Sequence, residues 1–484
     1  MTSFPHPPFS PRLAKRLIIV ATTTLLLGGC ASTAINQNFE NTQRFGRQHF
    51  GAEIRWLTTD EARREAQADV DARLAKPLGA DDAVQIALAY SPALQAMLFE
   101  GAAGAASATQ GARLPNPVFA FDRLVRNEGG ARELEIGRVL SFSVLDLVLL
   151  PSRLRMADYQ QQTARLTLAG NVLDVANATR AAWVNAVAAQ QSLEYFQQVK
   201  TTADASAELA RRMRAVGNYS KLQRAREQAF SADAVAQLAR AQHNARSTRE
   251  ALVRTLGLND GQAAALKLPP RLPDLPASAR AEAAVAQAAI AQRLDIQISR
   301  ASLEFLAREH GLSRITSVVN GLEVGAVRNS ETGLAPQRGY EVSLPLPIFD
   351  FGDATRAHAQ ATYMAALNRT AQVAVEASSQ VREQYGAYRT AYDLARHYRD
   401  EIVPLRKTIA EENVLRYNGM LIGVFELLAD AREQVASVVQ AIEAQRDFWL
   451  ADAGLQASLI GRPIETGAPA GPSARSGGDG GERH

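Results

Sequence analysis

The chain has one cysteine in 484 residues, Cys30, so it cannot form an internal disulfide. Aromatic residues are also scarce, at 6% of the total, whereas alanine is abundant along the whole chain. Small side chains of this kind allow helices to approach one another closely. We therefore expect the fold to form without a disulfide.

Long apolar runs and an excess of one charge are lacking too. After Cys30 no apolar stretch approaches the roughly 20 residues that a membrane-spanning helix needs, so any part inside a bilayer must be lipid or strand. The 53 basic residues nearly balance the 50 acidic residues, and the net charge is +3. The arginines are scattered rather than grouped with aromatics, which argues against a nucleic-acid partner.

Catalytic and metal-binding motifs are absent from the sequence. It has no phosphate loop, no GxSxG and no HExxH, and its seven histidines show no ligand spacing. We therefore expect no enzyme activity, no metal site and no cofactor.

The N-terminal residues are typical of an export signal. Three basic residues precede the apolar stretch 17–27, which is too short to span a bilayer. The string Leu27-Gly28-Gly29-Cys30 resembles a bacterial lipobox, which implies cleavage before Cys30 and acylation of its thiol. Ala31 in the next position implies sorting to the outer membrane. We assign 1–29 to a lipoprotein signal peptide and 30–79 to an acylated N-terminal segment. An ordinary signal peptide with a chance cysteine is the alternative.

Two halves of the chain repeat each other at an offset of about 200 residues. Each half contains a short apolar helix (83–96 and 284–298), two strand-like stretches, a long helix that reaches a glycine, and a helix containing AREQ. The glycines are Gly217 and Gly419, which we interpret as tip turns, and the tetrapeptides occupy 225–228 and 431–434. The predicted domains are a first repeat, a linker, a second repeat and a disordered tail: 80–261, 262–279, 280–462 and 463–484.

The helical stretches have the pattern of a coiled coil. Apolar and small residues alternate with 3–4 spacing over 172–196, and an unbroken helix over 152–214 would be roughly 90 Å long. We predict that the return helix packs against it through one row of residues: Leu222, Ala225, Ala229, Ala232, Ala236 and Ala239. Pro404 predicts a kink or a change of helix in the second repeat.

Four strand-like stretches alternate apolar and polar residues: 116–125, 134–144, 316–327 and 340–347. Glu135, Ser141, Ser143 and Glu341 fall on the polar side of the alternation. A membrane barrel must close, because open edges leave backbone groups unpaired in hydrocarbon. The smallest barrels have about eight strands, so several copies of this chain would have to share one barrel. A soluble antiparallel sheet with one solvent-exposed face alternates in the same way, so this alternative stays open.

This order of motifs over 80–462 resembles the outer-membrane efflux protein family, the TolC-like channels. The resemblance implies an α+β fold that is mostly α. A homotrimer would form a 12-stranded transmembrane β-barrel, with four strands per chain, continued by a long α-helical coiled-coil periplasmic tunnel. It also implies an outer-membrane location and a passive role as exit duct, with a periplasmic adaptor protein and an inner-membrane pump as partners. The only attached group expected is the lipid on Cys30.

The resemblance also suggests a gate near the second tip. In the family, a glycine in the tip turn is followed by a run ending in Leu-Asp-Ala whose acidic side chains narrow the tunnel mouth. Here Gly419 precedes Glu426 and Asp430, one residue further on than usual, and these two share a helical face. We hypothesise that three copies form an acidic constriction that pairs with Arg416 or Arg214. An ordinary solvated helix face is the alternative.

The four polar strand residues named above are the predicted lumen lining. Two other functions remain open at this point. One is a lipid-anchored periplasmic coiled-coil scaffold without a pore, and the other is the exit duct of a type I protein-secretion system. The pump selects the cargo in such assemblies, so the sequence does not specify a substrate.

Overall fold

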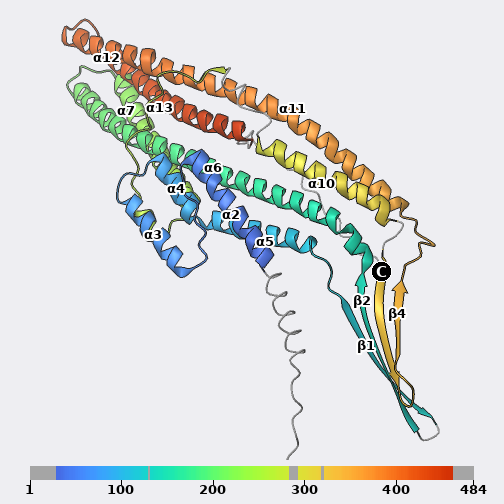
Figure 1. Ribbon diagram of the computed structural model, residues 1–484. Coiled ribbons are helices and arrows are strands. Elements are labelled where there is room, and N and C mark those ends of the chain that lie inside the picture. Colours follow the sequence, from blue (N-terminus) through green and yellow to red (C-terminus); the bar gives the residue numbers. More distant parts are fainter. Residues whose placement is uncertain (1–28, 129–130, 283–292, 318–320, 462–484) are drawn as a thin grey trace, which may run out of the picture.

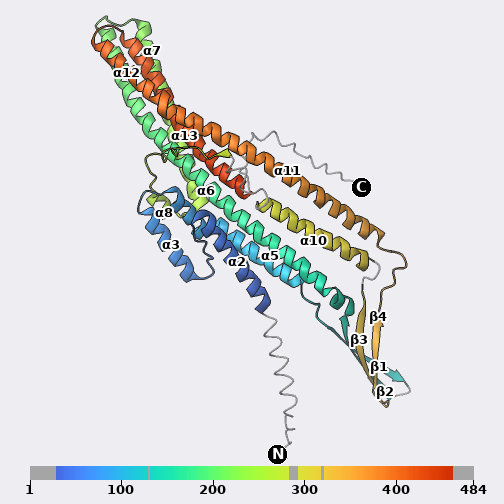
Figure 2. The same ribbon diagram turned by 45° about the horizontal axis from the view of Figure 1, so that its top comes forward.

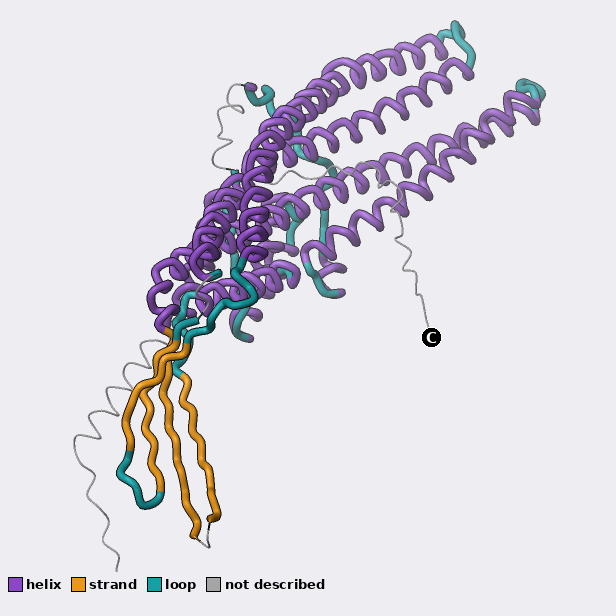
Figure 3. The backbone as a smooth tube through the Cα atoms, turned by 90° about the vertical axis from the view of Figure 1, so that its right-hand side faces the viewer, coloured by secondary structure: helices purple, strands orange, loops and turns teal. Residues whose placement is uncertain are grey.

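The computed structural model describes residues 29–128, 131–282, 293–317 and 321–461, and it is an elongated molecule (Figure 1). Long helices run along its length, and the strands extend from one end as a narrow sheet (Figure 3). The predicted tail and the signal peptide up to residue 28 lie outside the described residues, as does most of the predicted helix 284–298. The fold is mostly helical, as expected.

The described helices include a cluster near the N-terminus and the long helices of the two halves. Their bounds are α2 Gly29–Phe50, α3 Asp60–Leu74, α4 Ala80–Tyr90, α5 Pro92–Gly111, α6 Val144–Ala215, α7 Lys221–Leu256, α8 Asp260–Ala265, α10 Leu294–Thr316, α11 Asp353–His397, α12 Val403–Asn418 and α13 Val424–Ile460. The single helix predicted over 83–96 is in fact α4 and α5, because Pro92 disfavours a helical Ser91 and ends α4.

Four strands form one antiparallel sheet in the order β1-β2-β3-β4. They are β1 Val118–Glu128, β2 Ala131–Ser143, β3 Glu323–Glu331 and β4 Gln337–Ser343. The prediction was wrong at the start of the third strand, because Thr316 is still in α10 and the strand begins at Glu323. A short apolar alternation cannot distinguish the end of an amphipathic helix from a strand.

Helix α6 is longer than the sequence suggested. It has 72 residues, which corresponds to about 108 Å at 1.5 Å per residue. It begins at Val144, before Pro151, because the Ser143 hydroxyl caps it by accepting the backbone N–H of Asp146 at 3.2 Å. The predicted seam is confirmed: Val172, Thr179 and Ala186 are at most 1% exposed.

The predicted seam of the return helix is wrong. Leu222 is 61% exposed, and the other members of that row are exposed as well. The buried row of α7 is a different one: Glu227, Ala234, Ala241, Ala245, Leu252, Val253 and Leu256. Alanines occupy several faces of α7, so the 3–4 period was recognisable but the sequence did not specify which face meets α6.

Pro404 marks a change of helix, as predicted. A π-helical turn, Tyr398–Ile402, joins α11 to α12, and Pro404 lies in the first turn of α12. Proline is tolerated there because backbone N–H groups of a first turn have no partner within their own helix.

The linker between the two predicted repeats packs in an extended conformation across α11 and α13. Leu272 and Leu275 are buried. The Trp449 indole N–H donates to the Pro273 carbonyl at 3.0 Å, and the Tyr392 hydroxyl donates to the carbonyl of Pro276 at 3.1 Å. The linker therefore belongs to the core between the helices.

Both halves close through a glycine. Gly257 ends α7 with φ +71°, and a Cβ at this position would lie 2.3 Å from the Pro92 Cδ at the start of α5. Gly461 ends α13 with φ +101°, and a Cβ there would lie 2.6 Å from the backbone nitrogen of Leu294, the first residue of α10. The end of α7 thus lies against the start of α5, and the end of α13 lies against the start of α10.

Alanine at Gly257 should destabilise the protein more than alanine at Gly217. Both glycines have positive φ, so each substitution carries a backbone strain of about 1 kcal/mol. Only the Gly257 methyl also meets another segment, since nothing lies within 4 Å of a Cβ at Gly217. Thermal unfolding followed by circular dichroism should show the larger loss for G257A. Equal losses would contradict the close packing against Pro92.

Candidate channel site: the sheet faces and the helical tip

The strand register assigns every strand residue to one of two faces. Residues directly opposite each other in neighbouring strands share a face. Ser141 is opposite both Val118 and Gly325, and Gly325 is opposite Glu341. The remaining predicted lumen residues, Glu135 and Ser143, lie on the same face because they alternate with Ser141 along β2. The predicted lumen lining is therefore gathered on one face.

We call this the acidic face. Its carboxylates come from all four strands: Asp122, Glu133, Glu135, Glu323, Glu331 and Glu341. Arg126 is the basic residue of this face in the described strands, and its guanidinium lies 4.0 Å from the Glu133 carboxylate. The Asp122 carboxylate rests over Gly137, where a Cβ would lie 2.3 Å from it. Near the hairpin tips a hollow is lined by Leu124, Glu135 and Glu331.

The opposite side of the sheet is the apolar face. Large apolar side chains on it are 41–83% exposed: Phe119, Phe121, Val125, Leu140, Phe142, Tyr340 and Val342. A contiguous exposed apolar surface of this kind marks contact with another apolar medium or partner. The sheet therefore separates an acidic side from an apolar side.

The two helical hairpins end at the far end of the molecule from the strands (Figure 2). Gly217 adopts φ +83° in the α6–α7 turn, and Ser220 caps α7 with a capping box. In the α12–α13 turn the left-handed residue is Met420 with φ +60°, whereas Gly419 has φ −79°. Both glycines are in tip turns as predicted, but in the second turn the strained conformation falls on a non-glycine residue.

The predicted gate residues lie at this end. Asp430 accepts a hydrogen bond from the Asn413 amide of α12, and Glu426 is exposed. Arg214 donates to the Tyr219 carbonyl at 3.0 Å, and Arg416 is exposed. Asp430 and Arg214 thus have partners within their own hairpins. Pairing of the acids with arginines between copies of the chain stays a prediction.

A buried polar network joins the two halves near the tips, and the sequence reasoning missed it. Glu227 of α7 is 1% exposed. Its carboxylate accepts from the Ser206 hydroxyl of α6 at 2.8 Å and from the Arg432 guanidinium of α13 at 3.1 Å. That guanidinium also lies 4.5 Å from the centre of the Phe230 ring. The signal was present, since Glu227 and Arg432 belong to the two copies of AREQ.

Tyr219 lies beside this network. It is 6% exposed, and burial, together with the negative charge of Glu227, raises the pKa of its hydroxyl. The hydroxyl therefore stays protonated at neutral pH. The carbonyl of the same residue accepts the hydrogen bond from Arg214, so the first tip turn is ordered by polar contacts.

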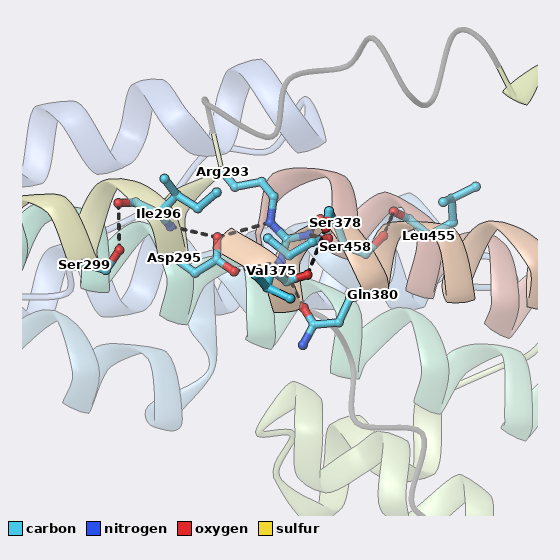
Figure 4. Close-up of polar contacts among 10 residues, drawn as sticks. Arg293, Asp295, Ile296, Ser299, Val375, Ser378, Gln380, Leu455 and Ser458 are labelled. Carbon is cyan, nitrogen blue, oxygen red and sulfur yellow. Dashed lines mark hydrogen bonds and ion pairs between the residues drawn. The ribbon is translucent and has the colours of Figure 1, made fainter. Parts of the chain in front are cut away.

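A buried arginine near the start of α10 was also missed. Arg293 is 1% exposed and directly precedes α10. Its guanidinium forms a bidentate pair with Asp295, at 3.1 and 2.7 Å, and donates to the Ser458 carbonyl of α13 at 2.6 Å. It also donates to the Gln380 amide oxygen of α11 (Figure 4). A further hydrogen bond goes to the Ala377 carbonyl of the same helix. No sequence motif surrounds Arg293 that would have identified it.

Within the described ranges, no group of three or more histidine, cysteine, aspartate or glutamate side chains is arranged to hold a metal ion. In the same ranges, no helix combines the length and the apolar character required to cross a bilayer. Cys30 is the second residue of α2.

Comparison with known proteins gave matches in structure. No family model and no curated protein sequence matches the chain. A membrane protein from Pseudomonas aeruginosa aligns with a TM-score of 0.67 and 18% identity, over 85% of this chain and 97% of that one. The outer membrane protein VceC from Vibrio cholerae aligns with a TM-score of 0.67 and 15% identity, over 83% and 98% of the two chains.

The Campylobacter jejuni CmeC outer membrane channel aligns with a TM-score of 0.68 and 14% identity, over 88% of this chain and 93% of that one. Each of these alignments covers more than four fifths of this chain. They confirm the resemblance seen in the sequence at the level of the fold. The chain therefore has the fold of the outer membrane protein VceC and of the CmeC outer membrane channel.

Proposed function

We propose that the chain is the outer-membrane component of a tripartite efflux system and serves as a passive exit duct for small molecules or ions. The observation that carries the proposal is the four-stranded sheet with one acidic and one apolar face at the end of a set of long helices, of which α6 is about 108 Å long. Its fold, shared with outer-membrane channels, supports the same role. An adaptor protein and an inner-membrane pump would supply the energy and select the cargo.

Closure of the barrel requires other copies of the chain. The sheet has two edges, β1 and β4, whose outward backbone groups have no strand neighbour among the described residues. In hydrocarbon each unpaired group is unfavourable by several kcal/mol. Three copies would join β4 of one chain to β1 of the next and give twelve strands in one ring. The internal duplication would give each chain two similar helical hairpins below the ring of strands. The similar glycine ends of α7 and α13, at Gly257 and Gly461, support this duplication.

The two faces of the sheet suit a barrel wall. The apolar face would contact lipid, and the acidic face would line a lumen that favours cations over anions. At the helical end, Glu426 and Asp430 would narrow the opening, with Arg416 and Arg214 as pairing partners across copies. A lipid on Cys30 would tether α2, which packs against α5 and α6, to the membrane surface.

Purified protein in planar bilayers tests the proposal directly. A channel should behave as a heat-sensitive trimer and conduct ions, and the Cys30→Ala variant should stay in the membrane fraction. A pore-free scaffold would conduct nothing and become soluble when Cys30 is replaced. Conductance would thus separate the two functions even if both bind membranes.

Neutralising Glu135 and Glu331 should reduce the preference of the channel for cations. These two residues face each other across β2 and β3 on the acidic face. Three copies of E135Q/E331Q would remove six carboxylates from the lumen, so the reversal potential in a salt gradient should move toward that of a non-selective pore. Glu65→Gln is a matched control, since Glu65 is exposed on α3, away from the sheet. An unchanged reversal potential in the double variant would contradict the lumen assignment.

A further inference from the structure

A row of arginines crosses the apolar face of the sheet. Arg138 of β2 is directly opposite Arg328 of β3, and Arg328 is directly opposite Arg338 of β4. Arg123 of β1 lies two residues nearer the hairpin tips, opposite Ile136. We call the first three the arginine row.

No carboxylate of the described strand residues shares this face. The ion pair between described strand residues, Arg126 with Glu133, lies on the acidic face. Arg328 and Arg338 are exposed, and Arg138 is partly buried. The sheet thus concentrates acids on one side and arginines on the other.

The arginine row is unfavourable unless an anion accompanies it. Neighbouring strands are about 4.8 Å apart, and like charges directly opposite each other destabilise a sheet. A lipid-facing arginine is unfavourable by about 2–4 kcal/mol at the bilayer midplane but by only about 0–1 kcal/mol near the interface. Three adjacent arginines are therefore compatible with the lipid-facing side only at the level of the headgroups.

The position of the arginine row along the strands agrees with the level of the lipid headgroups. Between it and the helices the apolar face carries two tiers of apolar side chains, one at Leu140 and one at Phe142, and the chain continues beyond β4 with exposed Leu344 and Leu346. Leu346 follows Arg338 by eight residues, which corresponds to about 27 Å of extended chain. At the usual tilt of barrel strands, this length of chain spans about 20 Å along the barrel axis. That height is close to the apolar band of about 25 Å in outer-membrane barrels.

We propose that the arginine row binds the phosphate groups of lipid headgroups in the outer leaflet. This inference rests on the proposed function, which places the helices in the periplasm and the hairpin tips outside. Guanidinium groups bind phosphate through paired N–H donors, more specifically than ammonium groups do. Three guanidinium groups spread over about 10 Å match a headgroup that carries more than one phosphate, because one such lipid would compensate charges on neighbouring strands.

Native mass spectrometry of the detergent-solubilised protein tests the inference. The lipid probes are a glycolipid with two phosphates (lipid A), phosphatidylglycerol and zwitterionic phosphatidylcholine. The protein should bind the bis-phosphorylated lipid best, and R138Q/R328Q/R338Q should weaken that binding by at least about tenfold, a change of about 1.4 kcal/mol. Arg126→Gln is the matched control, since it removes an arginine from the acidic face of the same sheet and should bind lipid as the unaltered protein does.

Two further variants keep the test interpretable. Replacing all three arginines by lysine preserves the charge but removes the paired donors, so lipid binding should be intermediate. If the triple glutamine variant does not assemble, the single R328Q in the centre of the row replaces it and should still weaken lipid binding. Heat sensitivity of the trimer on gels reports assembly for every variant.

Several results would overturn the inference. One is equal lipid binding by R138Q/R328Q/R338Q and the unaltered protein. Another is displacement of the lipid by inorganic phosphate at equal concentration, which would indicate a site for free anions. Planar-bilayer conductance separates this failure from that of the proposed function. A protein that conducts ions but binds lipid independently of the row contradicts only the inference, and one that never conducts contradicts the channel itself.

Discussion

Replacing Arg293 by methionine should lower the free energy of unfolding by at least about 3 kcal/mol, because it removes one member of a buried, hydrogen-bonded pair. Asp295, which is 28% exposed, would lose its bidentate partner. The carbonyl groups of Ser458 and Ala377 would lose a charged donor. Thermal unfolding of the purified protein, followed by circular dichroism, measures the effect.

The reason for the large effect is the position of Arg293. It is the junction of α10, α11 and α13, and Gly461 closes over it, since a Cβ on Gly461 would lie 2.8 Å from the Arg293 Cβ. Methionine fills similar space but removes the donor to the Ser458 carbonyl, which lies in the last turn of α13 where carbonyl groups lack helical partners. Loss of this contact should loosen the second half of the chain as a unit.

Two variants serve as controls for Arg293. Arg300→Met makes the same substitution at an exposed position of α10, the helix that Arg293 precedes, and should change stability by less than about 0.5 kcal/mol. Arg293→Lys keeps the charge but cannot bind Asp295 and two carbonyl groups together, so its loss should be intermediate. Equal stability of R293M and R300M would show that the buried network contributes little.

In the channel proposed above, Glu227→Gln should open the helical end more often. Glutamine keeps the size of the side chain and can still contact Ser206, but it removes the negative charge that pairs with Arg432 at 3.1 Å. A hydrogen bond to a charged group contributes about 1.5–3 kcal/mol, so three copies should raise the open fraction at least about tenfold. Mean conductance in planar bilayers measures the change.

The second copy of AREQ provides the matched control. Glu433→Gln is the same substitution in the same tetrapeptide, but the Glu433 side chain is 57% exposed and pairs with Arg406. Surface pairs of this kind contribute little, so E433Q should leave conductance unchanged. Equal conductance in E227Q and E433Q would show that the buried tie between α7 and α13 does not hold the tip closed.

The sheet illustrates how much could be predicted from sequence. Side-chain alternation has a period of two, so it followed from residue order alone that Glu135, Ser141 and Ser143 share one face of β2. The arginine row was invisible, because the opposition of Arg138, Arg328 and Arg338 depends on how strands far apart in sequence pair. Alternation specifies a face within a strand, whereas register determines which residues meet across strands.

The helices show the same division. The sequence by itself determined the coiled-coil period, the tip turns, the change of helix at Pro404 and the order of elements in two halves, since these depend on local spacing and on proline and glycine geometry. Only the tertiary structure decided which face of α7 meets α6 and that Glu227 and Arg293 would be buried beside distant helices. Small apolar residues on several faces leave such choices open, and they are resolved only when all partner helices pack together.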